Sequence, residues 1–292
     1  MPEHFYETGS PFIPAKPPPS STKREDRVAN KASQSWLILI YQAKIADFFR
    51  KITVTWSKNL VNHYLCFNVE NPYDDQHPYT FKTDLKASQF WNKKGLKNFE
   101  IDGKRAFVYW DFRQAKFSSN PAPSSDYYVA IVYEDEIVLL LGDSLNDAYK
   151  RTKKRPTFPE ATLLCKKENV YGKKLFCTRA LLGDGKEEHD IVIENSLFGP
   201  GDPEMWISID GISTIRILNL NWRFRGNETI SMNDTSIQIF WDVHDWLFNE
   251  SSSSYGLFIF NPNTIECASS ANKESDDSIQ GFCHVLYALK MG

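Results

Sequence analysis

One sequence pattern occurs twice in this chain. Residues 102–117 read DGKRAFVYWDFRQAKF, and residues 233–248 read NDTSIQIFWDVHDWLF. At a constant offset of 131 residues, identical residues coincide: Trp91 with Trp222, Gly95 with Gly226, Trp110 with Trp241, Asp111 with Asp242, and Phe117 with Phe248. A strand-like run that ends in Trp-Asp and then recurs predicts one supersecondary unit that is used twice.

Both copies of this run alternate as a β-strand with one buried face does. Successive side chains of a strand point to opposite sides of the sheet. One side is apolar in both copies: Ala106, Val108 and Trp110 in the first, and Ile237, Ile239 and Trp241 in the second. We predict that this side faces the core and that the two tryptophans occupy equivalent positions. The other side mixes polar and aromatic residues, which is typical of a partly covered sheet surface.

Short strand-like runs fill most of the remaining chain. They are WLILIYQAK (36–44), KITVTW (51–56), HYLCFNVEN (63–71) and YTFKTDL (79–85) in the first half, and HDIVIENS (189–196) and GFCHVLYALK (281–290) in the second. Turn signals such as Asn71-Pro72 and Asp102-Gly103 separate the runs. These features predict an all-β fold with two tandem, related antiparallel units. Each unit is expected to be a β-sandwich or a barrel-like body with one short helix.

The composition also divides the chain into parts. Residues 1–34 are rich in proline and serine, and such a stretch buries too little apolar surface to order itself, so we predict a disordered tail. We then predict a first β-unit, a basic linker, a second β-unit and a flexible loop within it, at residues 35–149, 150–160, 161–292 and 265–280. The basic cluster Lys150–Arg155 in the linker is also a candidate for nuclear import or phosphate binding.

Cysteine usage and charge bear on location and partners. The five cysteines include no Cys-x-x-Cys pair, so neither a zinc site nor a disulfide scaffold is predicted. The N-terminus lacks the pattern of a secretory leader, and apolar runs such as Ile137–Leu141 are too short to span a bilayer. A formal net charge of −3 does not favour nucleic acid. We expect a cytoplasmic location, or a nuclear one through the cluster Lys150–Arg155, with no membrane span and no nucleic-acid partner.

Two short clusters resemble functional sites but have simpler structural explanations. Asp242, His244 and Asp245 are metal-ligand residue types, yet three ligands within four residues rarely converge without a distant fourth. The segment GPGDPE (199–204) lacks the Gly-Lys-Ser/Thr ending of a phosphate-binding loop and indicates a turn. We predict no metal, no cofactor and no catalytic residue.

Asp111 and Asp242 stand where each copy is predicted to enter a helix. An aspartate at that position accepts hydrogen bonds from unpaired N–H groups of the first helical turn. Gln114 follows Asp111 at the spacing of a capping box. The alternative role is a catalytic carboxylate. We favour helix capping because it requires no further residue.

Four runs of residues carry a family resemblance. They are LLLGD (139–143), GDPEMWISIDG (201–211), FRGNETI (224–230) and FWDVHDWLF (240–248). The chain resembles the plant-specific domain of unknown function 868 family over about residues 33 to 290. The resemblance implies a plant protein and assigns no catalytic residue.

The sequence predicts a non-catalytic protein-interaction or scaffold module. The alternatives are a carrier of a small apolar ligand in a β-cavity, or an enzyme with a site between the two units. Where the copies differ, Trp246 replaces Ala115, so Asp245, Trp246 and Phe248 are the candidate residues for binding an unknown protein partner. An outward Trp246 would anchor that partner, because aromatic residues dominate interface hot spots. An inward Trp246 would instead fill space between the copies.

Overall fold

The computed structural model describes residues 34–60, 62–74, 76–86, 93–182, 187–197, 201–232, 235–249, 254–263 and 282–291. Several predicted features lie outside these residues: the tail up to Ser33, Trp91, the start of the GPGDPE turn and the loop at 265–280. Residues Gln34–Gly292 form one compact unit.

Two sheets make up the first half of this unit. Four consecutive antiparallel strands form one of them: β1 (Ser35–Ile45), β2 (Phe48–Lys58), β3 (Asn62–Val69) and β4 (Tyr79–Lys86). The other sheet has the order β11-β10-β9-β6-β5, from β5 (Lys94–Ile101), β6 (Lys104–Asp111), β9 (Tyr128–Tyr133), β10 (Glu136–Gly142) and β11 (Arg155–Pro156). Alternating residues such as Ile52, Val54 and Val108 are fully buried in the core that both sheets share. In the sequence between β6 and β9, β7 (Lys116–Phe117) pairs with β8 (Pro123–Ser125), and α1 (Leu145–Thr152) follows β10.

The second half also consists of two sheets with a core between them. One sheet is four-stranded: β13 (Leu175–Leu181), β14 (Glu188–Ser196), β15 (Glu204–Ile209) and β16 (Ile212–Ile217). The other contains β17 (Arg225–Met232), β18 (Thr235–Asp242), β19 (Tyr255–Asn263), β20 (Cys283–Lys290) and β12 (Thr162–Gly172), with α2 (His244–Phe248) between β18 and β19. Ile193, Ile207, Ile239 and Phe258 are among the buried residues that fill this core.

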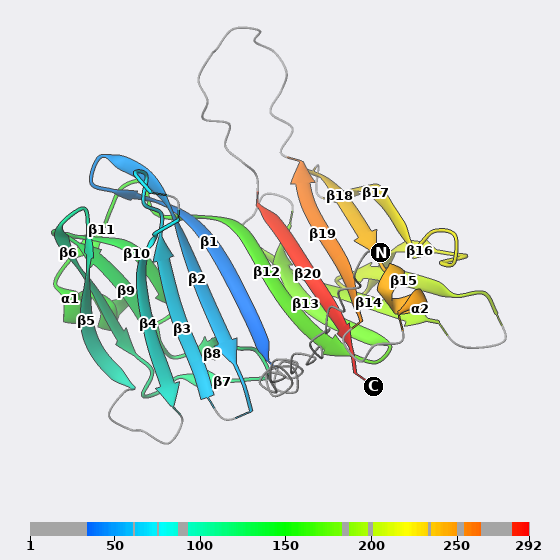
Figure 1. The fold of residues 1–292 in the computed structure, drawn as a ribbon, viewed down its shortest axis with the longest axis horizontal. Helices are drawn as coiled ribbons and strands as arrows, with labels where there is room; N and C mark the ends of the chain where they lie inside the picture. The colour runs from blue at the N-terminus through cyan, green and yellow to red at the C-terminus, as the bar shows by residue number, and fades with distance from the viewer. Residues whose placement is uncertain are drawn as a thin grey trace, which may run out of the picture. The chain divides into compact units, whose positions relative to one another are not determined.

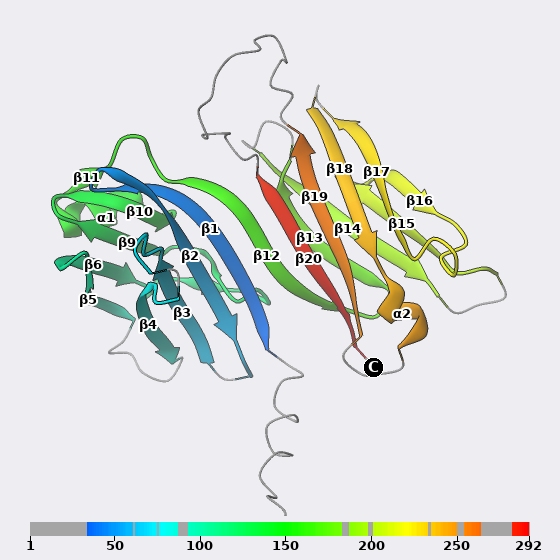
Figure 2. The same cartoon turned by 45° about the horizontal axis from the view of Figure 1, so that its top comes forward.

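A single nine-stranded sheet connects the two halves. Its order is β17-β18-β19-β20-β12-β1-β2-β3-β4, and β1 pairs with β12 in antiparallel fashion. Figures 1 and 2 show β12 between β1 and β20. The all-β prediction is confirmed, and each half consists of packed open sheets. Two pairings depart from the predicted antiparallel pattern, since β10–β11 and β12–β20 are parallel.

The repeated tryptophans lie in matching surroundings. The order β5-β6-β9-β10 in the first half corresponds to β17-β18-β19-β20 in the second. Trp110 pairs with Gly95 and Trp241 with Gly226, and both indoles are buried. A Cβ atom on Gly95 would lie 2.2 Å from the Trp110 ring, and one on Gly226 would lie 2.4 Å from the Trp241 ring. Only glycine therefore fits opposite each ring.

The predicted helix after Asp111 does not form. Asp111 is the last residue of β6, and its Oδ1 accepts a hydrogen bond from the Arg113 N–H at 3.2 Å within a turn. Phe112 then inserts into the core, 3 % exposed, so the capping box with Gln114 is wrong. In the second half Asp242 makes the same bond to the His244 N–H at 3.1 Å, and here α2 does begin. The helix of the first half is α1, which packs on the outer face of the β9–β10 sheet.

The basic segment at 150–160 is part of the folded unit. Lys150 and Arg151 lie in the last turn of α1, and Lys153, the residue after its end, has a left-handed conformation with φ of 57°. Lys154 pairs with Asp135, and Arg155–Pro156 extend the sheet as β11. No helix among the described residues has the length and apolar character needed to cross a membrane.

Candidate functional site

Trp246 lies in the core of the second half. It is 3 % exposed, and its ring stacks on Phe176 with centroids 5.0 Å apart. Its Nε1–H donates a hydrogen bond to the carbonyl oxygen of Ala288 at 3.0 Å. The outward orientation is therefore excluded, and Trp246 cannot touch a partner. The inward side chain fills the sandwich of the second half rather than a space between the halves.

Burial of Trp246 leaves the opposite side of α2 at the surface. His244 and Phe248 are four residues apart, so they lie on the same side of the helix. Together with Phe224 they form a group of rings that we name the α2 cluster. Ring centroids are 5.4 Å apart for Phe224 and His244, 5.7 Å for Phe224 and Phe248, and 4.9 Å for His244 and Phe248. Phe248 is 52 % exposed.

Backbone and tryptophan hydrogen bonds hold the α2 cluster in place. The Val243 N–H donates to the Phe224 carbonyl oxygen at 2.8 Å, which joins the start of α2 to the start of β17. The buried Trp241 donates from Nε1 to the carbonyl oxygen of Arg223 at 3.0 Å. The hydrogen bonds of two buried indoles, Trp241 and Trp246, therefore fix the part of the fold that carries the α2 cluster.

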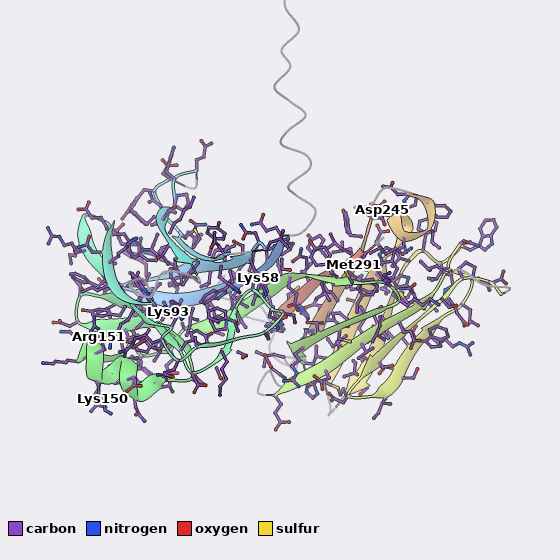
Figure 3. All side chains as sticks on the ribbon, turned by 90° about the horizontal axis from the view of Figure 1, so that it is seen from below. Lys58, Lys93, Lys150, Arg151, Asp245 and Met291 are labelled. Atoms are coloured by element: carbon purple, nitrogen blue, oxygen red, sulfur yellow. The ribbon has the colours of Figure 1, made fainter. Side chains whose placement is uncertain are left out.

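Charged groups border the α2 cluster. Arg225 pairs with Asp242 at 2.7 Å, and its guanidinium lies 5.7 Å from the Phe224 ring centre. Asp245 projects beside α2, with about a third of its side chain exposed, and Figure 3 shows it at this end of the molecule's second half. Its Oδ1 lies 3.5 Å from His244 Nδ1. Within the described ranges, no group of three His, Cys, Asp or Glu side chains is placed to hold a metal ion, and this includes Asp242, His244 and Asp245.

A groove of about 700 Å³ runs beneath the β1–β12 pair. The first half lines it with apolar side chains, including Leu39, Tyr127 and Leu141, and with uncharged polar residues at 118–120. Strands of the second half contribute polar side chains, including Glu168, Arg179 and Asp190. The charged side chains that line the groove therefore come from the second half, whereas both halves contribute apolar side chains.

Glu168 is a buried carboxylate of the groove with a strongly perturbed pKa. It is 7 % exposed, and its Oε1 accepts hydrogen bonds from His284 Nε2 at 2.9 Å and from the Thr178 hydroxyl. Lys166 Nζ lies 3.1 Å from the same oxygen. Burial opposes ionisation, but the hydrogen bond from His284 and the charge of Lys166 outweigh it and lower the pKa of Glu168 to about 2. Burial lowers the pKa of His284.

Sequence reasoning missed Phe224 and the Glu168–His284 pair. Phe224 follows a turn, and only the folded chain brings it to α2. Glu168 did carry a signal, because it lies in the strand-like run ATLLCKKENVYG on the same face as the apolar Val170. A charged residue on such a face predicts a buried ion pair.

The fold defines an all-β protein in which two sandwich halves share one sheet. The chain belongs to a plant family, because the family model described as "Plant protein of unknown function (DUF868)" matches residues 32–290. This confirms the resemblance seen in the sequence runs. Comparisons with curated proteins and with solved structures gave no match.

Proposed function

We propose that this plant protein is a non-catalytic binding module that recognises a protein partner through the α2 cluster and Asp245. The observation that carries the proposal is a group of rings at the surface, of which Phe248 is half exposed, above a filled core. Aromatic side chains that become buried on binding supply much of the energy of protein interfaces.

The surroundings of the α2 cluster define the partner's chemistry. Phe224 and Phe248 offer an apolar surface, and Asp245 adds a partly exposed negative charge. Arg225 is already paired with Asp242. The surface therefore fits a protein segment with an apolar side chain flanked by lysine or arginine.

Phe248→Ser tests this proposal in the full chain. We expect the variant to fold and to bind its partner at least about tenfold more weakly, a loss of about 1.4 kcal/mol. The partner is isolated from plant extract on the wild-type chain, and its Kd is then measured with purified proteins by calorimetry. Phe49→Ser is the matched control, because Phe49 is 54 % exposed and lies in the first half. Equal Kd values for wild type and Phe248→Ser would refute the proposal.

The groove favours a second candidate function, a carrier of a small molecule. Its volume of about 700 Å³ falls in the range of about 300–1,000 Å³ that is typical of ligand sites. A lining of apolar side chains with charged ones from the second half suits an amphipathic molecule rather than the small apolar ligand expected from the sequence.

An amphipathic fluorescent probe tests the carrier function. We expect 1-anilinonaphthalene-8-sulfonate to bind the wild-type chain and to lose most of its fluorescence gain with Leu181→Arg, because Leu181 lines the groove. Leu60→Arg is the control, since Leu60 is 88 % exposed and lies outside the groove lining. Equal probe binding by both variants would rule out the groove as the site.

The other hypotheses stay predictions. An enzyme site in the groove would use Glu168, yet this carboxylate is ionised and already bonded to His284 and Thr178.

The cytoplasmic location, with nuclear import through Lys150–Arg155, rests on the sequence; Figure 3 shows Lys150 and Arg151 together on α1. The duplication rests on the matched strand order and on the Trp-Gly pairs.

A further inference from the structure

Two cysteines lie side by side where β12 and β20 run parallel. Cys165 and Cys283 are direct partners in this pairing. Adjacent strands are about 4.8 Å apart, which lies within the Cα–Cα range of about 4.4–6.8 Å that a disulfide requires. Both residues are partly exposed and carry free thiols. The backbone therefore already holds these two residues at the separation of a disulfide.

The two side chains also share one face of the nine-stranded sheet. His284 and Leu286 are fully buried and point into the core of the second half. Because side chains alternate along a strand, Cys283 points to the outer face. Cys165 is its direct neighbour in the parallel register and points the same way. A small oxidant reaches both sulfurs from that side.

The two thiols interact and differ in acidity. A hydrogen bond from Cys165 lowers the pKa of Cys283 to about 7, with help from the positive charge of Lys167 and against the effect of burial. The same hydrogen bond and burial raise the pKa of Cys165. Cys283 is therefore the more acidic of the two thiols, and the thiolate is the reactive form of cysteine.

We propose that Cys165 and Cys283 form a dithiol site that hydrogen peroxide converts to a disulfide between β12 and β20. The Cys283 sulfur attacks one peroxide oxygen, the O–O bond breaks, and the second oxygen leaves as water after protonation. The Cys165 sulfur then displaces the sulfenic hydroxyl and gives up its proton, so that a second water forms. Two thiols and one peroxide thus yield one disulfide and two waters; sulfur is oxidised and peroxide oxygen is reduced.

Alkylation followed by mass spectrometry tests the proposal. In the full chain with Cys66→Ser, Cys177→Ser and Cys267→Ser, only Cys165 and Cys283 remain. After peroxide treatment and unfolding, we expect both thiols to resist iodoacetamide, the mass to fall by two hydrogens, and dithiothreitol to restore alkylation. Peptide mapping of the unmodified wild-type chain should show the same Cys165–Cys283 link.

Single variants separate the role of Cys283, which attacks peroxide, from the role of Cys165, which displaces the sulfenic hydroxyl. Cys165→Ser should leave a sulfenic acid on Cys283 that dimedone traps, whereas Cys283→Ser should react with peroxide at least about tenfold more slowly. The folded chain should also form the disulfide at least about tenfold faster than the same chain in urea, because the sheet holds the sulfurs together. Thiols that stay open to iodoacetamide after peroxide treatment, or equal rates for folded and unfolded chains, would overturn the proposal.

Discussion

Replacing Trp246 by alanine is expected to lower the free energy of unfolding by about 3–5 kcal/mol. The change removes a buried indole that stacks on Phe176 and leaves the Ala288 carbonyl oxygen without the donor at Nε1. Such a loss is a large part of a typical stability of about 5–15 kcal/mol. Urea denaturation of the variant and the wild type, followed by circular dichroism, measures it.

Trp222→Ala is the matched control for this experiment. Trp222 is 88 % exposed, so its removal should change the free energy of unfolding by less than about 0.5 kcal/mol. If Trp246→Ala were as stable as Trp222→Ala, the burial of Trp246 and the orientation of α2 would both be wrong.

Acid is expected to destabilise the protein through Glu168. The folded pKa of Glu168 is about 2, against an ordinary value of 4.5. A lowered carboxyl pKa contributes stability above the ordinary value, and this contribution is lost as the pH falls through the folded pKa. The loss should therefore take place between about pH 4.5 and pH 2 and amount to about 3 kcal/mol. The lowered pKa of His284 adds a loss that begins below pH 6.5.

Glu168→Gln isolates the contribution of this carboxylate. We expect the variant to be less stable than the wild type at pH 7, and its stability to fall less steeply below pH 4.5. Urea denaturation at a series of pH values measures both effects. Glu188→Gln is the control, because Glu188 is an exposed carboxylate of the same groove. An unchanged acid dependence in Glu168→Gln would show that the Glu168 carboxylate does not govern acid stability.

Local patterns in the sequence predicted the strands and their buried faces. Ile52, Val54 and Trp56 alternate with polar residues, and all three are buried. In the repeated run, Trp110 and Trp241 lie on the predicted core side and are also buried. Alternation works here because a strand with one buried face needs an apolar residue at every second position. The sequence therefore predicted the all-β class and the core tryptophans.

The nine-stranded sheet was not predictable in the same way. Its halves join where β1 pairs with β12, and β12 in turn pairs with β20. Such partners are far apart in sequence, and no local pattern specifies which strand edge meets which. The Glu168–His284 pair and the neighbouring thiols of Cys165 and Cys283 were not predictable for the same reason, because each pair joins residues of β12 and β20.

The two Trp-Asp copies show how packing overrides a shared local signal. Asp111 and Asp242 make the same bond to the N–H two residues later, yet only the second copy forms a helix. Trp246 provides a large apolar side chain that is buried when the chain turns into α2. Its counterpart Ala115 offers no such burial, so the first copy remains a turn.

The proposed contact surface is tested most directly by hydrogen–deuterium exchange of the full chain with and without the partner that Phe248→Ser loses. We expect slowed exchange at residues 223–225 and 244–249 and unchanged exchange in β12 and β13, which line the groove. Slowed exchange confined to β12 and β13, with residues 244–249 unchanged, would contradict a binding role for the α2 cluster.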